Sequence, residues 1–305
     1  MIRFILIRLL QAIPVLLIIS VVTFAMVRTA PGGPFDQEVK MQDEVKAAIE
    51  AHYGLDKSAI EQYFVWLGNA LQGDLGPSFK YPNRSVHELI GDAFPVSLEL
   101  GIWAMLVALT LGVGAGLIAS TRPNTSRDYL PMSIAMFGIC IPRFVMGPLL
   151  ILVFSIYLQW YNSSGWFFAS DRVLPALTMG IYYAAYVARL TRGGMLEVLG
   201  QDYIRTARAK GADEKRIIFK HAFKGGMRPV VSFFGPAMAN LLAGSFIVES
   251  IFQIPGLGRY FIMAAFNRDY FLIQGTVMTY AVLIIVLNLL ADILLVWLSP
   301  RLRFD

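Results

Sequence analysis

The chain has 305 residues, of which 56% are hydrophobic and only 15% are charged, and its formal net charge is +5. An average soluble domain carries about 25% charged residues, so this composition excludes a water-soluble globule and favours a membrane protein. The single cysteine, Cys140, excludes an internal disulfide and any metal site built from cysteines.

Six apolar runs are long enough to cross a bilayer, since a spanning helix needs about 20 mostly apolar residues. Arg3 and Arg8 precede the first run, as in a secretory signal, but its length and Pro31 after the expected cleavage site favour an uncleaved span. The sequence therefore predicts an all-α integral membrane protein with six transmembrane helices. The predicted spans are 9–28, 94–119, 131–159, 173–192, 229–250 and 276–298.

Basic residues indicate which ends of the spans face the cytoplasm. If the N-terminus is cytoplasmic, most of the 26 Lys and Arg residues fall on that side, above all in the loop 193–228. Acidic residues are instead frequent in the long segment 29–93. Because positive residues favour the cytoplasmic side, we expect both termini inside and segment 29–93 outside.

Segment 29–93 contains a polar–apolar pattern that predicts two helices, near 41–53 and 58–72. We expect a small helical cap on the outer ends of the spans; the alternative is a simple surface connection. The expected organisation is a transmembrane helix at 1–28, an extracytoplasmic helical segment at 29–93, and a five-helix core at 94–305 with a cytoplasmic loop at 193–228.

Gly112 and Gly116 lie four residues apart in the second span. This small-xxx-small spacing lets two membrane helices approach closely. We expect a packing role for these glycines, with a gating hinge as the alternative.

Ionisable side chains at membrane depth are costly and are therefore candidates for function. Arg143 follows Pro142 in the third span, about 18 Å from its inner edge at a rise of 1.5 Å per residue. It either pairs with an acid on a neighbouring helix or faces a water-filled path. Glu99, near the outer end of the second span, and Asp292, about two turns from the inner end of the last, complete the candidates for a translocation path.

Several motifs that carry chemistry are missing from the sequence. It contains no G-x-x-x-x-G-K-S/T phosphate loop, no H-E-x-x-H zinc motif and no G-x-S-x-G motif. We therefore expect no catalytic residue, no metal and no cofactor site in this chain.

The most basic stretch of the chain lies between the fourth and fifth spans. Its periodicity predicts one helix from about Met195 to Lys210, ended by Gly211, and a second at 214–224, capped by Asp213. We expect Gly225-Gly226 to break the second helix. The expected apolar sides are Leu196, Leu199, Tyr203 and Ala207 on the first helix, and Ile218, Phe219, Ala222 and Phe223 on the second.

Two interpretations of this basic hairpin are open. A basic amphipathic pair can lie on anionic lipid. A hairpin of fixed shape can instead dock into a groove on a cytoplasmic partner. The turn at Gly211 favours docking, because a floppy basic loop would bind lipid equally well. A partner that supplies energy is expected, since this chain has no phosphate loop.

The hairpin contains the stretch YIRTARAKG at 203–211, followed by His221-Ala222. It resembles the coupling loop of ABC-importer membrane subunits, which generically reads E-A-A-x-x-G, nine residues, I-x-L-P. The chain departs from that pattern at Thr206, Arg208 and His221. These departures are similar to the peptide-importer branch, where D-Y-I/V-R-T-A-R-A-K-G and a later H-A are usual. APGGP at 30–34 and VESIFQIPGLG at 248–258 resemble the same branch, and the resemblance covers essentially the whole chain.

The resemblance is closest to the B-type permease subunit of oligopeptide importers and implies a type I ABC importer permease architecture, MetI-like. The implied partners are a second homologous permease, two ABC ATPase subunits that hold ATP and Mg²⁺, and an extracytoplasmic peptide-binding protein. Membrane lipid is expected and nucleic acid is not, and the implied location is the bacterial cytoplasmic (inner) membrane. The residues implied in ATPase coupling, within 202–224, are Asp202, Tyr203, Arg205, Thr206, Ala207, Arg208, Lys210, Gly211 and His221.

Other functions stay open at this point. A dipeptide or nickel/metal-chelate importer of the same family differs mainly in its binding protein. A proton-coupled secondary carrier using Glu99 and Asp292 is the alternative from another class. That carrier would not need the hairpin, and the spans show no obvious internal repeat of the kind many carriers have.

Overall fold

The computed structural model of the chain describes residues 2–34 and 43–298. Within them every regular element is a helix, apart from one isolated bridge between Pro77 and Ser85. Five helices there are long and apolar enough to cross a membrane, or six if one bent pair forms a single span. The all-α membrane class with six predicted spans is confirmed.

The chain divides into two compact units. Unit 1 comprises Met1–Ser97 and Pro255–Leu283, and unit 2 comprises Leu98–Ile254 and Ile284–Asp305. Two long helices, α4 (Val86–Thr121) and α14 (Tyr270–Leu298), contribute residues to both units.

Unit 1 joins α1 to the segment that follows it in the sequence. Its helices are α1 (Ile2–Thr29), α2 (Asp43–His52), α3 (Ala59–Leu71), α13 (Leu257–Asn267) and the first parts of α4 and α14. The Ser20 hydroxyl on α1 is hydrogen-bonded to the Tyr63 hydroxyl on α3 at 2.8 Å, and Gln274 Nε2 donates to the Ser20 carbonyl at 3.0 Å. The two helices predicted after the first span are present as α2 and α3; the expected positions 41 and 42 lie outside the described residues.

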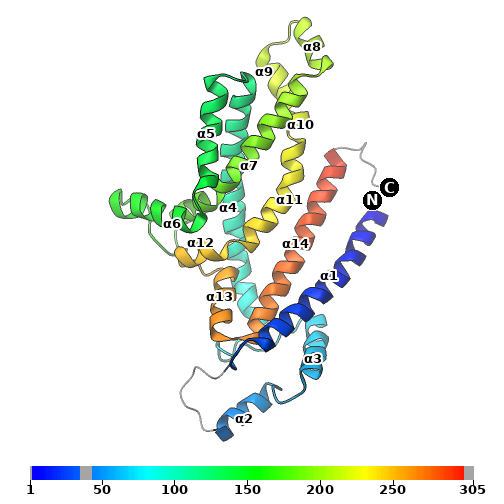
Figure 1. Cartoon of the computed structure of the whole chain (residues 1–305), viewed down its shortest axis with the longest axis vertical. Helices are drawn as coiled ribbons and strands as arrows, with labels where there is room; N and C mark the ends of the chain where they lie inside the picture. Colours follow the sequence, from blue (N-terminus) through cyan, green and yellow to red (C-terminus); the bar gives the residue numbers. More distant parts are fainter. Residues whose placement is uncertain (1, 35–42, 299–305) are drawn as a thin grey trace. The chain divides into compact units, whose positions relative to one another are not determined.

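Unit 2 is organised around α7 (Val173–Leu199), which Figure 1 shows between α5 (Ser126–Cys140) and α11 (Arg228–Ala243). Helix α4 packs closely on α7 through its glycines. A Cβ at Gly112 would lie 2.6 Å from the Ala184 carbonyl oxygen, and one at Gly116 would lie 2.6 Å from that of Ala188. The predicted packing role of these two glycines is confirmed, because a larger residue would push the helices apart.

The third predicted span is not one straight helix. It consists of α5 and of α6 (Arg143–Leu150) with η1 (Ile151–Tyr157), which meet at an angle of 103°. The break falls at Ile141, whose φ of −97° and ψ of 116° are extended, because Pro142 disfavours a helical residue before it. The expected depth of Arg143, which assumed a straight helix, is therefore wrong.

The fifth predicted span is also interrupted. Helix α11 ends at Ala243, and α12 (Phe246–Ile251) begins after Gly244 and Ser245. A short helix, η2 (Ala169–Arg172), leads into α7. Unit 2 therefore contains one span bent by 103° and one span, Arg228–Ile251, with a two-residue interruption, and both contact α7.

Candidate functional site

The basic hairpin of unit 2 connects α7 to α11. It consists of α8 (Asp202–Ala209), α9 (Glu214–Arg216), η3 (Ile217–Ala222) and α10 (Phe223–Gly226). The single helix predicted over 195–210 is wrong. Met195 belongs to α7, and Gln201, with φ −75° and ψ 152°, breaks the helix before α8 begins.

The turn between α8 and α9 depends on the backbone conformation of Gly211. Its φ is +79°, a left-handed value that glycine adopts cheaply, and no atom lies within 4 Å of the position that a Cβ would occupy. Asp213 begins α9, and its side chain accepts a hydrogen bond from the Lys215 backbone N–H at 3.3 Å. The predicted turn and helix cap are confirmed.

The underside of the hairpin is apolar and buried. Ile204 and Ile217 are fully buried and pack in one cluster with Val187 and Met195 of α7 and Val230 of α11. This packing fastens the hairpin to two spans of the same unit.

The apolar side predicted for the second hairpin helix is partly wrong. Phe219, expected to be buried, is 65% exposed, whereas Ile217 and Ala222 are buried. The segment 217–222 is a π-helix, in which residues five apart share a face. The prediction assumed an α-helix, in which residues three or four apart share a face. On the first helix Tyr203, expected on the apolar side, is 49% exposed, and Ile204 is buried instead.

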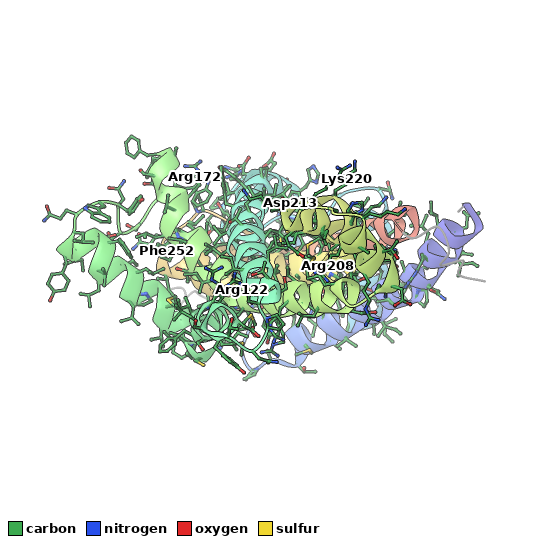
Figure 2. The ribbon with its side chains drawn as sticks, turned by 90° about the horizontal axis from the view of Figure 1, so that it is seen from above. Arg122, Arg172, Arg208, Asp213, Lys220 and Phe252 are labelled. Atoms are coloured by element: carbon green, nitrogen blue, oxygen red, sulfur yellow. The ribbon has the colours of Figure 1, made fainter. Side chains whose placement is uncertain are left out.

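The outer surface of the hairpin is polar and held in shape by local contacts. Arg208 binds Glu214 across the turn, with Nε–Oε1 at 2.8 Å, and the Tyr203 hydroxyl donates to the His221 carbonyl at 3.4 Å. Figure 2 shows Arg208, Asp213 and Lys220 on this hairpin. Of the predicted coupling residues, Ala207 and His221 are half-buried, and the others are exposed: Asp202, Tyr203, Arg205, Thr206, Arg208, Lys210 and Gly211.

The predicted helix break at Gly225-Gly226 is wrong. Both glycines are helical, and a Cβ at Gly226 would collide with the side chain of Met195. A Cβ at Gly194 would likewise collide with the Gly226 carbonyl. These glycines therefore bring α10 into backbone contact with α7.

Glu99 forms an ion pair with Arg172 of η2, with Oε1–Nε at 2.9 Å. The Arg172 guanidinium also lies 4.4 Å from the ring centroid of Trp166, whose Nε1 donates to Glu99 at 3.2 Å. Asp292 is half-buried on α14. Among the candidate path residues, Arg143 lines a cavity.

Arg143 lies at the start of α6, directly after the bend. Its guanidinium carbon is 4.8 Å from the ring centroid of Tyr182 and 5.6 Å from that of Tyr183. Within residues 2–34 and 43–298, no carboxylate forms an ion pair with it. The sequence analysis missed these tyrosines, although Tyr182 and Tyr186 have helical spacing.

A second ion pair that the sequence analysis missed joins α5 to α7. Arg192 binds the buried carboxylate of Asp128 through two contacts, Nε–Oδ1 at 2.6 Å and Nη2–Oδ2 at 2.7 Å. The Asn124 backbone N–H donates to the same carboxylate at 2.9 Å. No sequence signal indicated this pair, because its residues are 64 positions apart.

Unit 1 contains a buried carboxylate, Asp269, between α13 and α14. It accepts hydrogen bonds from the Ser78 hydroxyl and from the backbone N–H groups of Phe79, Lys80 and Leu272. Burial raises the pKa of the Asp269 carboxyl, although these hydrogen bonds act in the opposite direction. We call this arrangement the Asp269 clasp.

The residues beside the clasp bind the loop after α1. Arg268 has a left-handed φ of 55°, and its Nη1 donates to the Gly33 carbonyl at 3.3 Å. The Tyr270 hydroxyl donates to the Gly32 carbonyl at 3.3 Å. The stretches at 30–34 and 268–270, far apart in the sequence, therefore meet within unit 1.

Two family models match the chain. Residues 112–304 match the model described as "Binding-protein-dependent transport system inner membrane component". Residues 1–101 match the model described as "Binding-prot-dependent transport system membrane comp, N-term". Together they account for almost the whole sequence.

Curated relatives align over the full chain. It is 44% identical to the oligopeptide transport system permease protein OppB of Haemophilus influenzae and to that of Escherichia coli, with 100% of both chains covered in each case. It is 41% identical to the dipeptide transport system permease protein DppB of Bacillus subtilis, over 94% of each chain.

A solved structure shares the fold at low sequence identity. The inward-facing MetNI methionine ABC transporter aligns with a TM-score of 0.60 and 17% identity, over 69% of this chain and 96% of that one. The predicted MetI-like type I permease fold is confirmed.

Proposed function

The chain belongs to the family of inner membrane components of binding-protein-dependent transport systems, and from this premise we propose that it is a permease subunit of an ATP-driven oligopeptide importer. It forms half of a translocation path, and a second homologous permease forms the other half. An extracytoplasmic binding protein delivers the peptides. ATP and Mg²⁺ bind to two partner ABC ATPases, because this sequence contains no phosphate-binding loop.

The observation that carries the substrate class is the full-length similarity to oligopeptide permeases. The alignment leaves no long segment of this chain without a counterpart, and it includes 29–93. We also infer that 29–93 lies outside the membrane and faces the binding protein. The distribution of basic residues supports this orientation, with both termini in the cytoplasm.

The hairpin 202–224 is the proposed docking element for one ATPase. Its exposed polar surface provides groups for a partner, and its turn has a fixed shape because Gly211 is left-handed. Its apolar underside supports a mechanical role, since Ile204 and Ile217 pack on α7 and would carry a displacement of the hairpin to the spans. For transport to follow, ATP binding must favour one of the inward- and outward-facing states over the other.

Arg143 is the proposed path residue with the strongest structural support, because a cavity lies beside it. The ion pair of Glu99 with Arg172 supports a role in holding helices of unit 2 together rather than a contact with substrate. Asp292 remains a candidate.

Mild-detergent purification of this chain from its own membrane, followed by mass spectrometry, tests the proposed complex. We expect a second permease and two ATPases, and ligand stripped from a co-eluting binding protein should be peptide. A metal chelate in its place would assign the chain to the alternative importer branch.

The energy source separates an importer from a carrier. We expect peptide uptake to stop when ATP is depleted and to survive an uncoupler. The opposite result, with the chain purifying alone across several detergents, would contradict the proposal and favour the proton-coupled carrier.

A further inference from the structure

A cavity of about 470 Å³ lies among the helices of unit 2. It is lined by Arg143 of α6, by Tyr182, Tyr183, Tyr186, Phe233 and Asn240 of α7 and α11, and by Gly244. Its volume falls within the range of roughly 300–1,000 Å³ typical of ligand pockets.

The bent pair of helices and the interrupted span Arg228–Ile251 meet in this cavity. Arg143 begins the helix that follows the 103° bend, and Gly244 follows the end of α11. The two are close, because a Cβ at Gly244 would lie 3.0 Å from Arg143 Nη1. Discontinuous spans commonly form substrate sites in membrane transporters, since their free helix ends provide polar groups inside the membrane.

The charge in the cavity is positive. Arg143 lies in the bent pair of helices at 126–157, which is long and apolar enough to enter a membrane, and an arginine there is costly unless it meets water or a polar partner. In the described part of the chain its close contacts are the faces of Tyr182 and Tyr183, and no carboxylate neutralises it. The guanidinium therefore keeps hydrogen-bond donors for an anionic ligand.

The remaining lining is aromatic with polar tips. The hydroxyls of Tyr182 and Tyr186 lie 3.3 Å apart, and the ring of Tyr186 stacks on Phe233 with centroids 5.9 Å apart. Tyrosine rings alone can hold an ammonium group, but here Arg143 already covers two ring faces and would repel a second cation. The combination fits a carboxylate with an apolar body attached.

We propose that this cavity binds the C-terminal end of the transported peptide, with Arg143 and the tyrosine hydroxyls donating to its free carboxylate. The inference rests on the proposed function, because it assumes that the chain transports peptides. Since one arginine holds the charge, the site discriminates a free carboxylate from a blocked one and tolerates varied side chains. Tyr182 and Tyr186, which line the cavity, belong to α7. The same helix contributes Val187 and Met195, which pack against the hairpin.

The test compares tetra-alanine with its C-terminal amide in proteoliposomes that contain the complete transporter, with ATP inside and binding protein outside. We expect the wild type to import the free acid faster than the amide. In Arg143→Gln the ratio of the two rates should fall about tenfold, the factor expected for losing a hydrogen bond to a charged group. The wild type and Arg143→Gln receive peptide from the same binding protein, so any preference of the binding protein for acid or amide cancels when their ratios are compared.

Arg189→Gln is the matched control, because Arg189 is on α7 with the cavity tyrosines but is exposed and does not line the cavity. Its acid-to-amide ratio should equal that of the wild type. If Arg143→Gln does not assemble, Arg143→Lys and Tyr186→Phe provide the same readout with smaller changes, and each should lower the ratio.

The possible failures are distinguishable. Equal import of acid and amide by the wild type overturns the inference, as does an unchanged ratio in the assembled cavity variants, and both leave the peptide importer intact. Import of neither form by the wild type overturns the proposed function itself.

Discussion

The hairpin of unit 2 and the Asp269 clasp of unit 1 both hold a non-helical stretch between helices, but they bury opposite kinds of group. The hairpin buries Ile204 and Ile217 and leaves its charged side chains exposed. The clasp buries a carboxylate and satisfies it with one hydroxyl and three backbone N–H groups. The polar surface of the hairpin is exposed and can bind a partner. The carboxylate of the clasp is buried and hydrogen-bonded within the chain, so it can only stabilise the fold. From this difference we propose that the hairpin serves docking and that the clasp serves structural support.

Gly211→Val should have the strongest effect on transport. Valine is strained at a φ of +79°, at a cost of about 1–3 kcal/mol, so the turn relaxes and α8 moves relative to α9. If docking requires this shape, ATP-dependent uptake should fall to background, by about a hundredfold, since 1.4 kcal/mol is tenfold. Uptake and the amount of assembled permease in the membrane are measured together.

The control for this variant is Gly211→Asn. Asparagine tolerates the left-handed region, and the position of the added Cβ is open, so the turn should keep its shape. Near-normal uptake in Gly211→Asn would attribute the loss to backbone conformation. Normal uptake by Gly211→Val would refute the docking role of the hairpin.

Asp269→Asn should weaken the clasp without affecting the hairpin. One oxygen of Asp269 accepts from Ser78, Phe79 and Lys80, and the other accepts from Leu272. An amide has a single acceptor oxygen, so its NH₂ group must face at least one backbone donor, the Leu272 N–H. The local free energy of opening should fall by about 2 kcal/mol, or roughly thirtyfold in amide hydrogen exchange over 78–81 and 270–273.

Asp74→Asn serves as the comparison for the clasp variant. Asp74 accepts from the Gly76 N–H at 2.9 Å in the same segment, but it is exposed, and water can replace its contact. Its exchange rates should stay close to those of the wild type. Equal exchange rates in Asp269→Asn and Asp74→Asn would show that the burial of Asp269 contributes nothing to the stability of the clasp.

The clasp should also respond to pH. Burial raises the pKa of Asp269 in the folded protein, so its contribution to stability is complete below the unfolded pKa and is lost as pH rises through the folded pKa. Exchange over 78–81, corrected for the intrinsic rate at each pH, should therefore slow as the pH is lowered through the folded pKa of Asp269. Asp269→Asn should abolish that dependence. An opposite slope in the wild type would mean that the hydrogen bonds outweigh burial.

The parts of this fold that depend on local pattern were predictable from sequence. Apolar length located the spans, and Gly211 with Asp213 located the turn and the helix cap of the hairpin. Pro142 is a signal for a break, but its 103° angle depends on how α6 packs on α7 and α12. Sequence patterns do not contain such packing.

The candidate sites were predictable only in part. Ile217 and Ala222 are buried together because η3 is a π-helix, and helical periodicity assumed α-helical spacing. Asp269 contacts Ser78 across 191 positions of sequence, and Arg143 of α6 contacts Tyr182 of α7. Contacts of this range follow from tertiary structure, so the sequence identified Arg143 but not its cavity.

The Arg208–Glu214 ion pair gives the smallest expected effect and tests whether one exposed hairpin residue binds the partner or only stabilises the hairpin. Both side chains are largely exposed, so the pair should contribute only about 0.2–1 kcal/mol to hairpin stability. If the pair matters only for the hairpin's own shape, Arg208→Gln and Glu214→Gln remove the same interaction and should lower uptake equally. If Arg208 also contacts the ATPase, Arg208→Gln should lower uptake several-fold more than Glu214→Gln, with unchanged hairpin exchange rates. Equal losses of uptake in the two variants would mean that Arg208, like Asp269, only stabilises the fold. The contact with the ATPase would then belong to the other exposed residues of the hairpin.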